Sequence, residues 1–335
     1  MKSFIALALA GAVSALDDTT FKFMQYLSKQ NKSYASLEEF NMRLQNFADV
    51  EKFIQEWNAN KENTSTVGHN FLSDWTAEEK KKLNGYGGER PVPKEAGIHQ
   101  LDENQTAPTS VNWVTTNNVG AVQDQGQCGS CWAFSATGAA AAAMSIRYNS
   151  TPTYQSQQQL VSCSSSFGNQ GCNGGWYFYA WNYMQTNAQV AASTYPYTSG
   201  NFGITGQCNT AALAPGVVNT QSPTAYVYAG RSNALMQSAI AVKPNSVAIE
   251  ADQAVFQQYT GGVITSSTCG TTIDHAVLAV GYGTDPTYGA YWLVQNSWGT
   301  SWGDQGYVKI GMSASGWPGI CGINKDVYYP NVQSA

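Results

Sequence analysis

The sequence predicts an α+β protein in which a helical N-terminal region precedes a larger region of mixed helices and strands. Three observations lead to this prediction. Apolar residues recur every three or four positions between Phe40 and Trp57, as on one face of an α-helix. A run of small residues at 139–143 is typical of a buried helix. The segments 275–280 and 291–294, bounded by Gly and Asp-Pro, are typical of sheet strands.

Composition and charge restrict the classes of function. The chain has 335 residues, 43% of them hydrophobic, which is enough for a full core and for more than one compact unit. The net charge is only −5, and the sequence contains no run of Lys or Arg. Such runs are the usual footprint for nucleic acid or for an anionic membrane. The composition therefore indicates neither of these partners.

The first 15 residues have the pattern of a signal peptide. A basic Lys2 precedes an apolar run at residues 4–12, and small residues follow at 13–15. The apolar run is about half as long as the roughly 20 residues that a membrane-spanning helix needs, and no later segment is long enough either. We therefore expect residues 1–15 to direct the chain into the secretory pathway, toward a lysosome-like vesicle or the extracellular space.

Asparagine and cysteine residues agree with this route. Four Asn-x-Ser/Thr acceptors for N-glycosylation stand at Asn31, Asn63, Asn104 and Asn149. The seven cysteines all lie at or beyond Cys128, and exported thiols usually form disulfides. Because seven is odd, at least one cysteine stays unpaired, either for an intermolecular bridge or as a reactive thiol.

Charge density divides the chain into residues 16–106, which are rich in charged side chains, and residues 107–335, which are poor in them. This change predicts two regions with different roles. In the first region, Ser36 and Glu39 form a capping-box pattern at the start of the long amphipathic helix. A shorter helix is expected to begin at Thr20 and to carry on one side Phe21, Met24 and Leu27.

Cys131 opens the alanine-rich helix and is the candidate nucleophile. Unpaired N–H groups and the helix dipole at a helix N-terminus stabilise a thiolate and lower the thiol pKa from about 8.5. The alternative is a structural disulfide. The spacing Cys128-x-x-Cys131 also fits a redox motif or half a zinc site. Residues 107–335 hold one histidine and no second such pair, so we expect no metal. We expect no redox chemistry either, because the Gly- and Gln-rich lead-in does not resemble the βαβ unit of a redox domain.

His275 is the one histidine of this second region, because His69 and His99 precede it. A cysteine protease needs an imidazole to pair with the thiolate and to protonate the leaving amine, so His275 is the candidate. Asn296 has an amide oxygen that can accept the second imidazole N–H and fix the tautomer, with Trp298 shielding that bond. The alternatives are a buried structural histidine and a turn asparagine.

Four segments together resemble the signature blocks of papain-like cysteine proteases, in the same order: residues 125–134, 171–175, 274–277 and 296–299. The N-terminal region is similar to cathepsin L-type propeptides. The matching positions of its helix motif are Glu39, Arg43, Phe47, Ile54 and Asn58, and those of the short motif that follows are Gly68, Asn70 and Asp74. Two positions depart from the pattern, Val50 where Asn is usual and Leu72 where Phe is usual.

This resemblance implies the architecture of a precursor. Residues 107–335 are expected to form a papain-like two-subdomain fold, with a helical subdomain that carries Cys131 and a β-barrel-like subdomain that carries His275 and Asn296. The active site would be the cleft between them. Residues 16–106 are expected to form a helical inhibitory propeptide that crosses this cleft until it is cut away near Ala107. The implied protein is a monomeric cysteine endopeptidase without a cofactor, and its substrates are proteins and peptides.

The resemblance also implies roles for further residues. Gln125 would supply the side-chain amide of the oxyanion hole, together with the backbone N–H of Cys131. The implied disulfides are Cys128–Cys172, Cys163–Cys208 and Cys269–Cys321, which leave Cys131 free. The implied substrate-binding residues are Gly174, Gly175, Trp176, Tyr177, Ala248, Ile273, Asp274, Ala276, Trp298 and Asp326.

Asp326 is an unusual residue for the far end of the main selectivity pocket. A carboxylate there predicts that the pocket accepts Arg as well as apolar or aromatic side chains at the second residue before the cut. The alternative is that Asp326 points toward Lys325 or solvent. The carboxylates of the propeptide, including Glu39 paired with Arg43, should lose charge in acid, which predicts acid-triggered activation. A non-catalytic relative or an isolated inhibitor is disfavoured, because the four residues of the catalytic pattern occur together.

Overall fold

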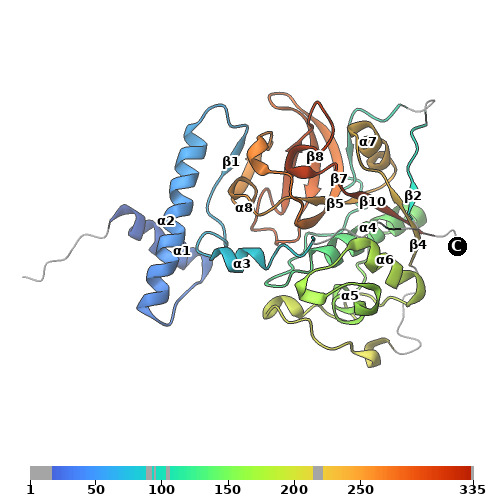
Figure 1. The fold of residues 1–335 in the computed structure, drawn as a ribbon, viewed down its shortest axis with the longest axis horizontal. Coiled ribbons are helices and arrows are strands. Elements are labelled where there is room, and N and C mark those ends of the chain that lie inside the picture. The colour runs from blue at the N-terminus through green and yellow to red at the C-terminus, as the bar shows by residue number, and fades with distance from the viewer. Residues whose placement is uncertain (1–16, 88–92, 94–95, 103–105, 214–221, 333–335) are drawn as a thin grey trace, which may run out of the picture.

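The computed structural model describes residues 17–87, 93, 96–102, 106–213 and 222–332 (Figure 1). The expected signal peptide at residues 1–15 and the glycosylation acceptor Asn104 lie outside these ranges. Within them, none of the helices combines the length and the apolar character needed to span a bilayer.

Three helices form the N-terminal region, on the left of Figure 1: α1 (Asp18–Gln30), α2 (Leu37–Ala59) and α3 (Ala77–Lys81). Phe23, Tyr26 and Leu27 of α1 pack against Phe47 of α2 in a small core. The face expected for α1 was therefore wrong for Phe21 and Met24, which are exposed, and right for Leu27, which is buried. The helix also begins before Thr20, because the side chain of Asp17 caps it by accepting the Thr20 amide.

The long helix predicted from periodicity is confirmed as α2, but its capping differs from the expected box. Ser36 Oγ accepts the Glu39 amide at 3.1 Å. The Glu39 carboxylate does not return to the cap and instead accepts from Arg43 at 3.4 Å. A complete capping box opens α3, where Thr76 and Glu79 exchange hydrogen bonds of 2.8 and 3.2 Å.

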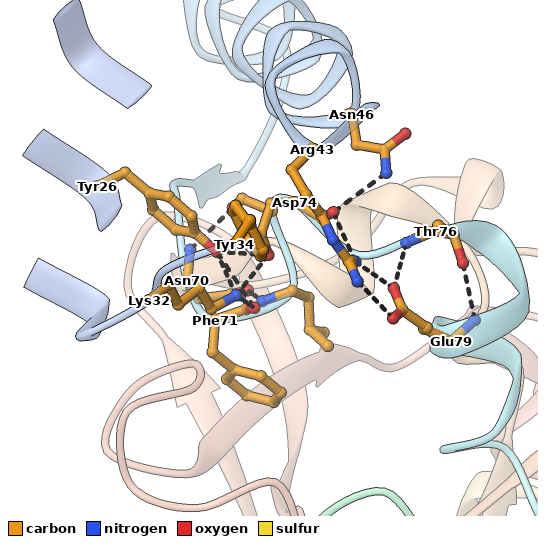
Figure 2. Close-up of polar contacts among 12 residues, drawn as sticks. Tyr26, Lys32, Tyr34, Arg43, Asn46, Asn70, Phe71, Asp74, Thr76 and Glu79 are labelled. Carbon is orange, nitrogen blue, oxygen red and sulfur yellow. Dashed lines mark hydrogen bonds and ion pairs between the residues drawn. The ribbon is translucent and has the colours of Figure 1, made fainter. Parts of the chain in front are cut away.

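A polar cluster ties the three helices together (Figure 2). Asp74 is fully buried and accepts hydrogen bonds from Tyr26, at 2.9 Å, and from Tyr34 and Lys32. Arg43 of α2 pairs with Glu79 of α3, with one Nη2 to Oε1 distance of 2.8 Å. We call these residues the Asp74–Glu79 cluster. A buried carboxylate is stable only when it is hydrogen-bonded, so the cluster fixes how the helices meet.

The N-terminal region is joined to the rest of the chain by a short sheet. Strand β1 (Ser65–Val67) pairs antiparallel with β6 (Tyr259–Gly262). The Asn58 side chain donates to the oxygen and accepts from the amide of Val67, at 2.8 and 3.1 Å. The Asn70 side chain donates from Nδ2 to the backbone oxygen of Gln257 at 2.7 Å. Two asparagines of the propeptide-like motifs thus hold the connecting segment in place.

The region after residue 107 has a helical half and a sheet half. The helices of the first half are α4 (Cys131–Tyr148), α5 (Gln157–Cys163) and α6 (Tyr177–Thr186). Short 3-10 turns lie at Ser165–Phe167, Gly171–Asn173, Ser199–Asn201, Thr210–Leu213, Ser267–Cys269 and Ile320–Gly322. Helix α4 is buried from Cys131 through Ser145, as its small residues predict. It packs against β5, β7 and β10 of the sheet half.

The main sheet has eight strands. Its order is β2, β4, β10, β5, β7, β8 and β9, and β3 also pairs with β7. The bounds are β2 (Gly97–Ile98), β3 (Val111–Asn112), β4 (Pro223–Tyr228), β5 (Asn245–Ile249), β7 (His275–Asp285), β8 (Gly289–Gln295), β9 (Tyr307–Gly311) and β10 (Val327–Val332). Helices α7 (Asn233–Val242) and α8 (Ala254–Gln257) belong to this half. The predicted α+β class and the strands at 275–280 and 291–294 are confirmed.

All seven cysteines lie within the described ranges. The disulfides are Cys128–Cys172, Cys163–Cys208 and Cys269–Cys321, as the family resemblance implied. Two of them brace the helical half, and the third braces the sheet half. Cys131 is the free cysteine.

Candidate active site

Helix α4 and strand β7 bring the expected nucleophile and imidazole to one place. Cys131 is the first residue of α4, and His275 is the first residue of β7, against which α4 packs. Asn296 directly follows β8, the antiparallel neighbour of β7. Its Oδ1 lies 2.8 Å from His275 Nε2, so this nitrogen donates. The ring of Trp298 lies 4.9 Å from the His275 ring, and both are buried.

Burial decides the protonation of this pair in the precursor. Cys131 and His275 are both fully buried. Burial disfavours the charged form of each group, raising the pKa of the Cys131 thiol to about 12 and lowering that of His275 to about 4. The thiol pKa thus shifts in the direction opposite to that expected from the helix N-terminus alone. Both shifts favour the neutral forms of thiol and imidazole while the site is covered.

The cover is a propeptide segment at residues 83–86. Gln125 Nε2 donates to the backbone oxygen of Leu83 at 2.8 Å. The Gly175 amide donates to the oxygen of Gly85 at 2.9 Å, and the Tyr86 amide donates to the oxygen of Asp274 at 2.8 Å. The covering segment is therefore hydrogen-bonded to both halves of the enzyme region.

Close packing at Gly85 excludes any side chain. A Cβ added there would lie 1.9 Å from the backbone oxygen of Gly129. Gly174, which follows the 3-10 turn of the helical half, has a φ of +120°, and a Cβ there would lie 3.0 Å from the Gly85 oxygen. Two glycines thus allow the two backbones to meet.

Tyr86 fills a pocket built from the expected selectivity residues. Its ring is fully buried, 4.6 Å from the ring of Trp176 and 4.8 Å from that of Tyr177. Its hydroxyl donates to Oδ2 of Asp326. Ala248 and Ala276 belong to the same buried cluster, and Ile273 packs against it.

Asp326 faces this pocket and not the surface. Its side chain is fully buried. Lys325 turns elsewhere and donates from Nζ to the backbone oxygen of Thr271 at 2.6 Å. The hydroxyl of Tyr177 donates to the backbone oxygen of Asp326 at 2.9 Å. The arrangement differs from the alternative in which Asp326 points toward Lys325 or solvent.

Asp274 links the covering segment to the sheet half. Its carboxylate accepts from the Ala251 amide and from Asn84 Nδ2, both at 2.8 Å. Burial nevertheless raises the pKa of this carboxyl to about 7. Asp274 therefore changes charge near neutral pH in the covered state.

Sequence reasoning missed several residues of this site. Ser297 donates from Oγ to Gln125 Oε1 at 2.7 Å, and the Gln125 nitrogen donates to the backbone oxygens of Leu83 and Cys128 at 2.8 and 2.9 Å. The position of Ser297 directly after Asn296 in the sequence was the signal that could have identified this contact. Gly85 and Tyr86 were also missed, because no motif extends to them. Among the described residues, no group of three or more His, Cys, Asp or Glu is placed to hold a metal.

Comparison with known proteins agrees with this geometry. Residues 107–331 match the model of the papain family of cysteine proteases, and residues 23–79 match that of the cathepsin propeptide inhibitor domain. Digestive cysteine proteinase 3 of Homarus americanus is 38% identical, with 97% of each chain covered. A cathepsin L-like peptidase of Aedes aegypti is 36% identical, over 91% of this chain and 83% of that protein.

Among solved structures, digestive procathepsin L2 from the larval midgut of Tenebrio molitor is similar, with a TM-score of 0.83 and 32% identity. The match covers 93% of this chain and 99% of that one. It therefore includes the propeptide as well as the enzyme region. The chain belongs to the papain family of cysteine proteases, as a cysteine-type endopeptidase precursor that carries its own propeptide inhibitor domain.

Proposed function

We propose that the chain hydrolyses peptide bonds through Cys131, His275, Asn296 and Gln125 once the propeptide has been removed. The Cys131 thiolate attacks the carbonyl carbon, and the oxyanion that forms accepts hydrogen bonds from Gln125 Nε2 and from the Cys131 backbone N–H. The His275 imidazolium protonates the leaving amine, which leaves a thioester on Cys131. Water, deprotonated by His275, then hydrolyses the thioester. Asn296 keeps the imidazole in the required tautomer.

The observation that carries this proposal is the way in which residues 83–86 occupy the site. The Leu83 oxygen accepts from the donor that an oxyanion would use. Tyr86 lies in the pocket that would take the second residue before the cut. In a substrate that residue precedes the scissile carbonyl, whereas here Tyr86 follows Leu83. The propeptide thus runs in the opposite direction to a substrate, which explains inhibition without cleavage.

The test uses an epoxide inhibitor that alkylates active-site thiolates. We expect labelling of Cys131 in the processed enzyme and no labelling in the precursor, where Cys131 is fully buried. Cys131→Ser should remove both labelling and activity while leaving all three disulfides and the folded precursor intact. Retained activity in Cys131→Ser would exclude the proposed nucleophile.

We further propose that the pocket prefers aromatic and apolar side chains at the second residue before the cut and also accepts Arg. The rings of Trp176 and Tyr177 favour flat apolar groups. In the precursor the Tyr86 hydroxyl donates to the Asp326 carboxylate. This contact supports Asp326 as the acceptor for a hydrogen-bond donor at the tip of a substrate side chain. Phenol and guanidinium groups both carry that donor, whereas Phe and Leu do not.

This preference is tested with peptides that carry Tyr, Phe, Leu or Arg at that position. A hydrogen bond to a charged group changes binding by about tenfold or more. We expect Asp326→Ala to lower the Tyr-to-Phe and Arg-to-Phe ratios of kcat/KM by about that factor. Asp326→Asn, which keeps the size and removes the charge, should affect Arg more than Tyr. Unchanged ratios in both variants would show that Asp326 does not read the substrate.

We propose that the precursor is a monomer that enters the secretory pathway and is activated by acid, either in a lysosome-like vesicle or after secretion. The relatives named as digestive proteinases support a secretory or extracellular setting. Detection of the precursor in the medium of expressing cells, with its N-terminus beyond residue 15, is the measurement that checks the route.

A further inference from the structure

Besides the β1–β6 sheet and the cleft, the propeptide touches the enzyme region at a third place, the edge of the main sheet. Strand β2 (Gly97–Ile98) lies parallel to β4, with Gly97 opposite Val227 and Ile98 opposite Tyr228. The His99 amide extends this pairing by donating to the Tyr228 oxygen at 2.8 Å. In Figure 1, β2 lies on the opposite side of the molecule from α1 and α2. Without β2, strand β4 would form this edge of the sheet.

His99 fastens this strand with both ring nitrogens. Nδ1 lies 2.9 Å from the hydroxyl of Tyr329 on β10, and Nε2 lies 3.0 Å from Oγ of Ser238 on α7. The ring also meets the Tyr329 ring edge to face, with centroids 5.7 Å apart. His99 therefore contacts three elements of the enzyme region, β10 and α7 through its ring and β4 through its backbone.

Other side chains of the segment contribute less. Ala96 packs against the core, but Ile98 is 71% exposed. Recognition thus rests on the backbone of β2 and on the His99 ring. An edge strand of this kind offers free N–H and C=O groups to any extended segment, as in β-strand addition.

The two sets of propeptide contacts are separate along the chain. Residues 83–86 cover the cleft, as described above. The hydrogen bonds described for residues 97–99 go to β4, α7 and β10. Removal of residues 83–86 from the cleft uncovers Cys131 and breaks none of the hydrogen bonds described for residues 97–99.

We propose that the edge of β4, with Ser238 and Tyr329, is a docking surface that holds residues 96–102 independently of the cleft. Cleavage of one peptide bond between Tyr86 and Gly97 then frees the site. Residues 97–102 stay on the sheet edge, as part of an N-terminal extension of an active enzyme. Their loss requires a second hydrolysis near Ala107. The proposal rests on the proposed function for the cuts themselves, which consume one water each.

Activation of the full precursor tests this order of events. Samples taken during processing are analysed by intact mass, N-terminal sequencing and activity toward a small fluorogenic peptide. We expect an active species that begins between residues 87 and 97 and that converts later to one beginning near 107. His99→Ala should shorten the lifetime of the first species about fivefold, the effect of one or two neutral hydrogen bonds. Ile98→Ala, at the exposed neighbour, is the matched control and should leave it unchanged.

A second measurement does not depend on activity. Hydrogen exchange is compared in the Cys131→Ala precursor with and without His99→Ala. We expect faster exchange of the backbone amide at position 99, which donates to Tyr228, and unchanged protection of the amides of Tyr86 and Gly175 in the cleft.

The outcomes separate the two proposals. A precursor that never becomes active contradicts the proposed function, while hydrogen exchange still reports whether docking is independent. The docking proposal is overturned if every active species begins at or beyond Ala107, if His99→Ala leaves the lifetime unchanged, or if the cleft amides lose protection together with position 99.

Discussion

Gln125 donates from its side-chain Nε2 to the backbone oxygen of Leu83 at 2.8 Å, so the propeptide occupies the donor that we propose for the oxyanion. The opposite end of the same amide accepts from Ser297 Oγ at 2.7 Å. A side-chain amide can turn about its last bond, but the backbone oxygens of Leu83 and Cys128 can only accept, and they fix the nitrogen end at 2.8 and 2.9 Å. The Ser297 hydroxyl adds a third contact, to the oxygen end. Inhibition and catalysis therefore depend on the same orientation of Gln125.

Ser297→Ala should lower kcat/KM of the processed enzyme by up to about tenfold, mainly through kcat, because Gln125 loses one of the two partners that orient its amide and keeps the Cys128 backbone oxygen, 2.9 Å from Nε2. Kinetics on Gln125→Ala and on the double variant form the control. If Ser297 acts through Gln125, the double variant will be no slower than Gln125→Ala alone. Losses that multiply in the double variant would show that Ser297 acts by another route.

Gly85→Ala should produce a precursor that is active without processing. The added Cβ would lie 1.9 Å from the Gly129 oxygen, which is backbone and cannot move aside cheaply. The covering segment must therefore lift from the cleft. We expect the unprocessed variant to bind the epoxide inhibitor at Cys131, unlike the parent.

The control for Gly85→Ala is built into the chain. Residue 85 leaves with the propeptide, so the processed enzymes from variant and parent are identical and must have equal kcat/KM. A variant precursor as inert toward the inhibitor as the parent would show that Gly85 is dispensable for closure.

Glu79→Gln should allow processing at higher pH. Burial raises the pKa of Glu79, but hydrogen bonds from Arg43 and from the Thr76 backbone outweigh it, and the net pKa is lowered. A lowered carboxyl pKa stabilises the folded propeptide above the ordinary value of about 4.5, and this stability is lost as pH falls below it. We therefore predict that the acid-triggered opening expected from the sequence involves the Arg43–Glu79 pair.

Because Glu79 is about one-third exposed, its effect is discounted to about three- to tenfold in the conversion rate at neutral pH. Conversion is followed by gel densitometry between pH 4 and 7. Glu78→Gln, at the exposed neighbouring residue, is the matched control and should behave as the parent. Identical pH profiles for both variants would remove Glu79 from the trigger.

The proposed catalytic residues can be selected from the sequence because their chemistry is local and sparse. His275 is the one imidazole after residue 107, and Cys131 opens a helix whose small residues mark it as buried. Helix α2 follows from its periodicity in the same way. The face of α1 does not, because Phe21 and Phe23 are both apolar, and the choice between them depends on Phe47 and Asp74 elsewhere in the chain.

The contacts of residues 83–86 with the cleft could not be predicted either, because they too depend on residues far away in the sequence. Tyr86 and Asp326 are 240 residues apart, and neither position shows alone that a phenol meets a carboxylate. The thiol pKa depends likewise on burial beneath residues 83–86, so the local effect of the helix N-terminus gives the wrong direction for the precursor. The sequence identifies the chemical type of each side chain, whereas its protonation state depends on the residues packed around it in the fold.

The glycosylation acceptors should differ in use. Asn149 is exposed at the end of α4, 18 residues and therefore about 27 Å from Cys131, so a glycan there leaves the cleft open. Asn63 is half-buried and donates from Nδ2 to the Trp57 oxygen at 2.8 Å, which a glycan would disturb. We expect peptide N-glycosidase to lower the mass of the processed enzyme from the parent but not that of the processed enzyme from Asn149→Gln. Asn63→Gln should leave the glycan mass of the precursor unchanged. A processed enzyme whose mass does not change on deglycosylation would contradict use of Asn149, and a lighter Asn63→Gln precursor would show that Asn63 tolerates a glycan despite its contact with Trp57.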